Sequence, residues 1–409
     1  MLLWTLALRN LRRNTRRTLI TMAGISLGLA LMVMSNNLSY GSHQDMLRRA
    51  ISLLAGHVVV QAQGYQADPD DGRVLVDSSQ AAAALRQALP EATIVRRLQV
   101  EGLMTSPTSS VGVVLRGVEP QLEATILDID ERLVEGEWLA DDDKAVVMGK
   151  SMVDSLGLTL GDKVVFMGQP DGDEVQSKLF RLRGIYETGS PELDGFVAVV
   201  TLAAAQELYA AQDPATQIAV HLDSDQQTEA ALASARAALP GTEREILAWP
   251  DAIPDIRDFV ALDSAINDGI WMILGVIVAM GVVNTVLMSV LERVREFGVM
   301  MSLGLRPGQL AAMVLSEGFA LGLISAFIGM ILGLAFSYPL VVYGLDFSEE
   351  FGQSMEVGSV PVSMVIYAEL DWSRLFVYPA VGIGFALFAS LYPAWKVMRL
   401  SPVQAIRHQ

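Results

Sequence analysis

The chain of 409 residues is 52% hydrophobic and only 18% charged, with a mean hydropathy of +0.38, which is too apolar for an ordinary soluble domain. The formal net charge of −17 is concentrated in one region, since residues 41 to 267 hold 17 basic and 36 acidic side chains, a difference of −19. Such an acidic block argues against nucleic-acid binding, which requires a basic surface. The absence of cysteine excludes a disulfide framework and thiolate metal ligands.

The start of the chain predicts an amphipathic segment followed by a membrane span. Residues 1–17 carry five arginines and no acid, with apolar residues between them, as in a helix that lies at a membrane surface. Residues 18–40 contain no charge and match the ~20 residues that a spanning helix needs. A cleaved signal peptide is the alternative interpretation, but its apolar core would be only about 7–15 residues long.

Three further stretches predict membrane-spanning helices. Residues 269–291 contain no charged side chain. Residues 309–344 are longer than a span requires, which indicates a tilted or projecting helix. Residues 374–395 have Tyr378 near one end and Trp395 at the other, as expected for anchors at the two membrane surfaces.

The distribution of charge orients these four spans. The 292–308 connector has three arginines, and the tail 396–409 has three basic side chains, whereas the 345–373 loop has six acids and no base. Because cytoplasmic segments carry an excess of lysine and arginine, we expect both termini and the connector to be cytoplasmic. The acidic block and the 345–373 loop are then outside.

The acidic block between the first two spans has the pattern of a folded domain. Strand and helix alternate at both of its ends, and its middle is rich in strands, which predicts a split β-α-β unit with an inserted β-rich lobe. Two flanking segments, 42–54 and 254–268, mix polar and apolar residues at helical spacing and could form a stalk. The alternative is that they are merely solvated helix ends.

The predicted fold class is therefore a polytopic α-helical membrane protein with four transmembrane helices and a large α+β extracytoplasmic domain between the first and second helices. The predicted parts are the amphipathic N-terminal segment 1–17, span 18–40, outer domain with stalk helices 41–268, span 269–291, connector 292–308, span 309–344, outer loop 345–373, span 374–395 and tail 396–409.

The connector contains a short helix with one apolar face. Phe297, Met300, Met301 and Leu305 recur at positions i, i+3, i+4 and i+8 of a helix predicted over 296–306, so one face could insert into a groove of another protein. The alternative is a helix that lies on the inner leaflet. Charged residues flank it and could fix docking, and Pro307-Gly308 is expected to end it.

Other motifs indicate that the chain carries no catalytic, metal or cofactor site. Gly149-Lys150-Ser151 resembles the end of a phosphate-binding loop, but Lys144 stands where the first glycine is required. The four histidines lack metal-ligand spacing, no nucleophile elbow occurs, and the acid run 141–143 lacks the calcium-loop pattern. Nucleotide hydrolysis is therefore expected on a separate chain.

Several features inside the spans leave two interpretations open. Glycines four residues apart, at 24/28, 318/322 and 329/333, could pack within this chain or against a second subunit. Methionines at 32, 34 and 46 could line an apolar cavity for an acyl chain or simply pack between helices. Glu317 could have a function in the membrane or lie at the interface beside Arg306.

Several short phrases occur in an order and spacing typical of one family. They are Leu6-Ala-Leu-Arg-Asn-Leu-Arg-Arg13, the passages 134–139, 145–150 and 156–164, the connector phrase Glu292-Arg-x-x-Glu-Phe-Gly298, and the ending 392–407. Together they resemble the permease subunits of the MacB/LolC/LolE/FtsX group of ABC transporters over nearly the whole chain.

This resemblance implies a mechanotransmission mechanism in a bacterial inner membrane. Two permeases pair as a homo- or heterodimer, a cytoplasmic ATPase dimer binds ATP and Mg²⁺, and movement passes to the periplasmic domains. It favours an ATPase-coupling role for eight connector residues: Glu292, Arg293, Glu296, Phe297, Gly298, Met300, Met301 and Leu305. It implies lipoprotein or lipid-linked cargo, with drug or peptide efflux or activation of a periplasmic hydrolase as alternatives. A periplasmic carrier or membrane-fusion protein is a further expected partner.

Overall fold

The computed structural model describes residues 15–66, 73–127, 132–140, 142, 144–170, 174–188, 191–347, 355–357, 360–362 and 365–399. The predicted amphipathic start, most of the predicted tail and two of the three acids in the 141–143 run lie outside these residues. The chain divides into two compact units. We call them the helical unit, residues 1–43, 261–346 and 365–409, and the α+β unit, residues 44–260 and 347–364.

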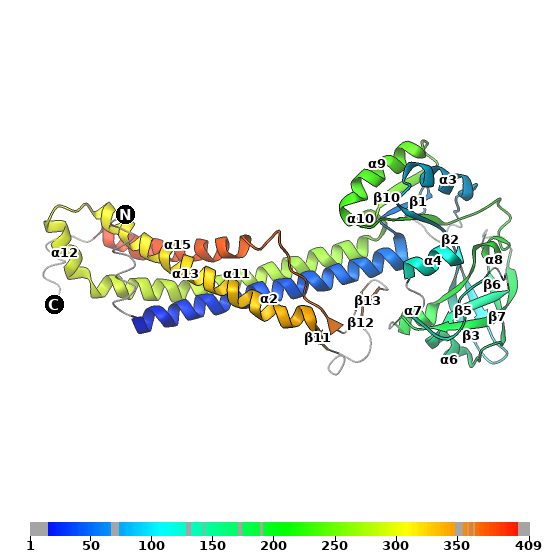
Figure 1. Cartoon of the computed structure of the whole chain (residues 1–409), viewed down its shortest axis with the longest axis horizontal. Coiled ribbons are helices and arrows are strands. Elements are labelled where there is room, and N and C mark those ends of the chain that lie inside the picture. The colour runs from blue at the N-terminus through cyan, green and yellow to red at the C-terminus, as the bar shows by residue number, and fades with distance from the viewer. Residues whose placement is uncertain are drawn as a thin grey trace. The chain divides into compact units, whose positions relative to one another are not determined.

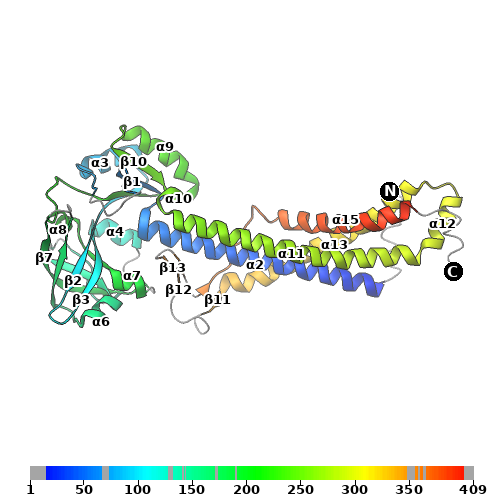
Figure 2. The ribbon, with the colours of Figure 1, turned by 180° about the vertical axis from the view of Figure 1, so that it is seen from behind.

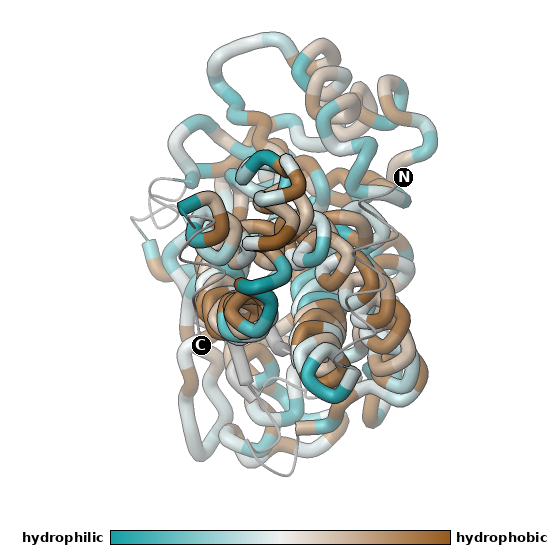
Figure 3. The backbone as a smooth tube through the Cα atoms, turned by 90° about the vertical axis from the view of Figure 1, so that its left-hand side faces the viewer, coloured by the Kyte–Doolittle hydropathy of each residue, from teal (hydrophilic) through white to brown (hydrophobic). Residues whose placement is uncertain are grey.

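Among the residues that the structure describes, four helices are long and apolar enough to cross a membrane, as predicted. They are α2 (Thr15–Ala50), α11 (Pro254–Glu292), α13 (Pro307–Val342) and α15 (Val377–Met398). The most apolar parts of the first three have mean hydropathies of 1.9, 2.3 and 2.4, and that of α15 is 1.4. Figure 3 shows brown, apolar residues recurring among paler and teal ones in the helical turns that face the viewer.

Close packing inside the helical unit depends on glycine. Figures 1 and 2 show α13 beside α15, and a Cβ atom at Gly318 or Gly322 would come within 3 Å of side chains of α15. At Gly329 and Gly333 it would come equally close to α2. These two glycine pairs therefore pack within the chain, which decides between the two interpretations left open for them. Gly24 has no neighbouring atom within 4 Å.

The α+β unit contains one sheet of ten strands among the described residues, in the order β10-β1-β9-β2-β3-β8-β5-β7-β4, with β6 pairing with β2 and β7. The strands are β1 (Val58–Ala62), β2 (Thr93–Thr105), β3 (Ser110–Val118), β4 (Leu133–Gly136), β5 (Ala145–Gly149), β6 (Lys163–Gly168), β7 (Gln176–Tyr186), β8 (Val197–Thr201), β9 (Gln217–His221) and β10 (Arg244–Ala248). Two further strand pairs are β11 (Leu345–Asp346) with β14 (Val365–Ile366), in the helical unit, and β12 (Met355–Val357) with β13 (Val360–Val362), in the α+β unit.

The first lobe of this unit is the predicted split β-α-β arrangement. Strand β9 lies between β1 and β2 and is antiparallel to both, and α3 (Ser78–Ala88) connects β1 to β2. Helices α3 and α9 (Thr228–Ala238) bury alanine and leucine side chains against valines and isoleucines of β1, β2 and β9. The alternating apolar pattern of these strands explains this core.

The second lobe is the predicted β-rich insertion. Its core includes Met148, Phe166 and Phe180 and is covered by α6 (Lys150–Leu156) and α8 (Leu202–Gln206). Strand β2 belongs to both lobes, since residues 93–97 pair with β9 and residues 102–105 pair with β6. The short helices α4 (Pro120–Leu127), α7 (Pro191–Phe196) and α10 (Trp249–Ala252) and the 3₁₀ turn η2 (Asp225–Gln227) complete the unit.

Both segments proposed as stalk are helical parts of α2 and α11. Within the α+β unit, Met46, Leu47 and Ala50 of α2 are buried in a cluster with Ile256 of α11. Met46 is thus an ordinary packing residue. The cavity beside Met32, lined also by Trp271 and Phe385, measures about 40 Å³, which leaves no room for an acyl chain.

Candidate functional site

The connector forms helix α12 (Val294–Ser302) between the ends of α11 and α13. The helix starts two residues before the predicted position and ends earlier, because Gly304 adopts φ +98°, a left-handed conformation that terminates a helix. Pro307 begins α13 and does not end α12, since proline is well suited to the first turn of a helix.

The predicted apolar face of α12 turns mainly toward its own chain. Phe297 is only 1% exposed and belongs to one buried cluster with Leu310 and Val314 of α13, while Met300 and Met301 pack partly against that cluster. Gly298 is also buried. Phe297 is therefore covered by residues of its own chain, and its insertion into another protein stays a prediction.

A different apolar surface remains exposed on the connector. Val299 is 47%, Leu303 77% and Leu305 38% exposed, and Arg295 and Arg306 are exposed beside them in the sequence. We call these five residues the connector surface. Sequence periodicity missed Val299 and Leu303, since it identifies an apolar face but does not say which neighbour covers that face.

Charged side chains tie the connector to two of the long helices, α2 and α13. Arg17 Nη1 of α2 donates to Glu292 Oε1 at 2.9 Å. Arg293 Nε donates to Glu296 Oε2 at 3.1 Å, and Arg293 Nη1 lies 3.6 Å from Glu317 Oε2 of α13. The buried Glu317 is thus paired with Arg293 and not with Arg306, the neighbour expected from the sequence.

Arg293 also connects the charged network to the buried aromatic ring. Its guanidinium carbon lies 5.2 Å from the centre of the Phe297 ring, within the range of a cation–π contact. Among the predicted coupling residues, Arg293 therefore links Glu296 to Phe297, whereas Glu292 pairs with Arg17. Their role toward an ATPase stays a prediction.

A second group of polar side chains fixes the end of α2 inside the α+β unit. After Ala50 the helix continues as the π turn η1 (Ile51–Ala55) and ends at Gly56, whose φ is +81°. The three successive carbonyls of Ser52, Leu53 and Leu54 accept hydrogen bonds from strand side chains. The donors are Arg97 Nη2 of β2 at 2.9 Å, Arg116 Nη1 of β3 at 2.9 Å and Gln217 Nε2 of β9 at 3.0 Å.

We call this group the helix joint. Arg97 Nε also donates to Glu123 Oε2 of α4 at 3.2 Å, and both side chains are fully buried. Burial lowers the pKa of Arg116, and the positive charge of Arg97 lowers it further. Carbonyls at a helix end have no partner within the helix, so these side chains satisfy groups that would otherwise be unpaired in the domain interior.

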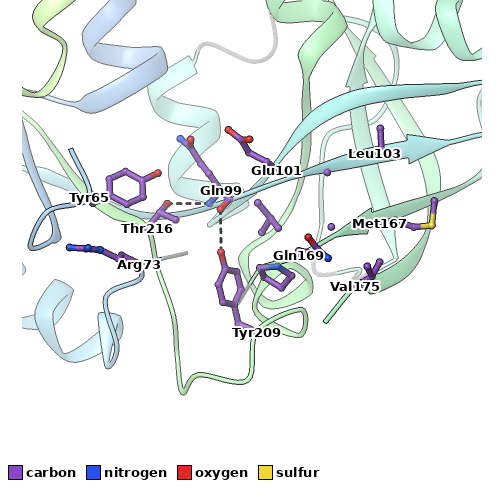
Figure 4. A pocket seen from close by; sticks show the side chains of 14 residues that line it. Tyr65, Arg73, Gln99, Glu101, Leu103, Met167, Gln169, Val175, Tyr209 and Thr216 are labelled. Carbon is purple, nitrogen blue, oxygen red and sulfur yellow. Dashed lines mark hydrogen bonds between the residues drawn. The ribbon is translucent and has the colours of Figure 1, made fainter. Parts of the chain in front are cut away.

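A cavity of about 630 Å³ opens along β2 in the α+β unit (Figure 4). Gln99 N donates to Thr216 Oγ1 at 3.1 Å, and Tyr209 Oη donates to the Gln99 carbonyl at 3.5 Å. Tyr65, Arg73 and Glu101 add polar groups, and Leu103, Met167 and Val175 add apolar ones. Its volume suits a small amphiphilic ligand. No local sequence pattern predicts this cavity, because its lining comes from distant segments.

The described residues contain no group of three or more metal-ligating side chains. His57 and His221, far apart in the sequence, have ring centres 6.4 Å apart, but His57 is held by the Leu222 N–H and by Asp225. Gly149 joins a strand to a helix as a phosphate loop would, yet a Cβ there would overlap the Asp194 backbone. The close approach of Asp194 explains this glycine without a phosphate.

Four apolar helices with an α+β unit between the first and second define a multi-pass membrane protein with a periplasmic-type domain. The family described as MacB-like periplasmic core domain matches residues 18–238, and the FtsX-like permease C-terminal family matches residues 270–402. The chain belongs to the FtsX-like ABC transporter permeases that carry a MacB-like periplasmic core domain. Membership implies partnership with an ABC ATPase.

Individual relatives are distant but extend over the whole chain. The lipoprotein-releasing system transmembrane protein LolC of Xylella fastidiosa is 23% identical over 98% of this chain and 97% of its own length. The macrolide export ATP-binding/permease protein MacB of Syntrophobacter fumaroxidans is 24% identical over 98% of this chain and 63% of its own length. The periplasmic region of MacB from Actinobacillus actinomycetemcomitans aligns with 50% of this chain and 94% of its own, with 14% identity and a TM-score of 0.36.

Proposed function

We propose that this chain is the non-catalytic permease subunit of a mechanotransmission ABC transporter in a bacterial inner membrane. A separate cytoplasmic ATPase dimer binds the connector surface, and ATP binding and hydrolysis there move α12. The ion pairs from α12 and the end of α11 to α2 and α13 pass this movement to the spans. The termini are cytoplasmic and the α+β unit is periplasmic in this proposal, as the charge distribution predicts.

The observation that carries the proposal is that helix α2 is held by charged groups near both of its ends. Arg17 is paired with Glu292 in the helical unit, and the carbonyls after Ala50 are held by the helix joint in the α+β unit. A continuous helix held in this way can transmit a displacement without a channel for cargo through the membrane.

Lipoprotein or another lipid-linked molecule is the proposed cargo. The supporting observation is that LolC of Xylella fastidiosa, named for lipoprotein release, aligns with this chain over nearly the full length of both. A second permease subunit and a soluble periplasmic carrier complete the proposed assembly.

The test is ATP-driven release from proteoliposomes. The complex of this permease with its ATPase should transfer an embedded lipoprotein to a soluble carrier, and the same protein without its acyl chains should serve as the control. ATP hydrolysis without transfer of any native lipoprotein would refute the proposed cargo.

Efflux of small molecules or peptides, as named for MacB, is the second candidate. The 630 Å³ cavity with mixed polar and apolar lining favours it, because that volume accommodates a drug-sized ligand. Under this function, deletion of the gene should raise sensitivity to a toxic compound. A membrane-fusion protein should also co-purify with the permease.

A further inference from the structure

The side chain of Asn284 is exposed in the interior of the span formed by α11. The structure describes every residue of the four predicted spans. Apart from Gln309 and Arg374, which open their spans, every other Asn, Gln, Ser, Thr, Glu and Arg side chain in them is buried or half-buried. At 1.5 Å per residue, Asn284 lies about 10 Å from the Leu291 end of the span, well inside the hydrocarbon.

An exposed carboxamide at this depth is unfavourable unless it finds a hydrogen-bond partner. The chain meets this requirement elsewhere, since the buried Asn37 Nδ2 donates to Ser337 Oγ at 3.0 Å and Thr21 pairs with Thr285 at 2.7 Å. Among the described residues, no hydrogen bond to the Asn284 side chain is formed. A neighbouring helix in the membrane can supply that partner.

The surroundings of Asn284 on α11 suit another helix. Gly281, one turn earlier, has no atom within 4 Å of the position that a Cβ would take, so a neighbouring backbone can approach closely. Ile277, Met280 and Met288 are exposed on either side along the helix. The most apolar window of α11 is also the least covered, with 17% of it buried against 33–39% in the other three helices.

We propose that this face of α11 is the seam with a second copy of the same chain, with the two Asn284 side chains hydrogen-bonded across a two-fold axis. A carboxamide has both a donor and an acceptor, so two identical groups facing each other satisfy one another with two hydrogen bonds. A second copy of the chain meets this requirement, because it presents the same carboxamide at the same position. The inference rests on the proposed pairing of permease subunits and identifies where they meet.

Disulfide cross-linking tests the seam directly, because the chain has no cysteine of its own. Asn284→Cys should give a cross-linked dimer on oxidation in membranes, and two differently tagged copies expressed together should be found in one product. Phe388→Cys, on α15 and 73% exposed, is the matched control and should remain monomeric. Cross-linking of Asn284→Cys only to a different protein would overturn the assignment to a second copy.

Substitutions test whether the amide contributes to pairing. Asn284→Leu should weaken dimerisation of the full chain in lipid by about 3- to 30-fold, and Asn284→Gln should retain most of it. Gly281→Leu should also weaken pairing without harming the fold of the single chain, whereas Gly384→Leu, equally free of neighbours on α15, should not. If the wild-type chain forms dimers in lipid but these substitutions do not weaken them, the proposed seam is wrong and the pairing itself stands. A wild-type chain that stays monomeric in lipid would refute the pairing itself.

Discussion

Phe297 illustrates how one buried ring changes the assignment of a functional surface. Its spacing with Met300, Met301 and Leu305 predicts a helical apolar face, and that face exists. The periodicity does not say what packs against this apolar face, because a helix packs such a face equally well against its own chain or against another protein. Only the burial of the ring beside α13 distinguishes the two cases.

Phe297→Ala should destabilise the helical unit by about 3 kcal/mol, as expected when a large aromatic side chain is removed from a core. Thermal unfolding of the purified chain in detergent would measure the loss, with Leu303→Ala, at an exposed position, as the neutral control. Unchanged stability together with lost ATPase binding would instead support the docking face predicted from the sequence.

Half-buried His221 predicts a pH dependence of the α+β unit. Burial, and then the nearby charges of Arg97 and His57, lower its pKa to about 3, so it is neutral when folded. In the unfolded chain this histidine binds a proton near pH 6.5. The stability that depends on its neutral form is therefore complete above that pH and is lost as the pH falls toward 3. Burial lowers the pKa of His57 also, although Asp225 opposes the effect.

His221→Gln should therefore reduce the loss of stability between pH 6.5 and 4, by up to about 1.4 kcal/mol per pH unit. Urea unfolding of the full chain, followed by protease cleavage within the α+β unit, would measure the slope. Parallel pH profiles for the variant and the wild type would show that another group is responsible.

Among the structural elements, the helix joint is one that no local sequence pattern predicts. Arg97, Arg116 and Gln217 lie on three strands and are separated by up to 120 positions, so no local pattern relates them to the end of α2. The strands themselves were recognised, since alternation of apolar residues is a local signal. Their pairing, such as β1 with β10, depends on contacts that no single segment contains.

Arg97→Met should destabilise the α+β unit by about 3–5 kcal/mol, because it leaves the Glu123 carboxylate buried without its partner. The double variant Arg97→Met/Glu123→Leu should recover most of this stability. Urea unfolding of the full chain would compare them. An equal loss in both variants would mean that the hydrogen bond to the Ser52 carbonyl, and not the ion pair, is the stabilising contact.

The connector surface predicts the effect of a charge on ATPase binding. Leu303→Asp and Val299→Asp should each prevent co-purification of the ATPase and should leave folding and membrane insertion intact, since both side chains are exposed. Val175→Asp, at an exposed position of the α+β unit, is the control. Normal ATPase binding and transport in both connector variants would exclude this surface as the docking site.

For the whole molecule, the class of fold followed from the sequence, because the bilayer is a solvent of fixed thickness that requires a minimum apolar length. The 630 Å³ cavity could not be predicted from the sequence, because it depends on how the two lobes of the α+β unit, which share strand β2, pack together. The role of Asn284 could not be predicted either, because it depends on the burial of the other amide and hydroxyl side chains in the interior of the spans.

The proposed orientation can be checked in the absence of native cysteines. Arg295→Cys, on the connector, should react with a membrane-impermeant maleimide only in inverted vesicles, and Asp223→Cys, in the α+β unit, only in right-side-out cells. Charge on the cytoplasmic segments is the physical reason for this topology. Reversed labelling would place the ATPase partner on the wrong side and refute the proposed mechanism.

Strand β2, which belongs to both lobes of the α+β unit, connects the helix joint to the large cavity. Arg97, which holds the last turn of the first long helix, is two residues from Gln99, which lines the large cavity. Under the proposed function, a pull on that helix end would reach the cavity wall along a single extended backbone, so that the wall would move in step with each ATPase cycle.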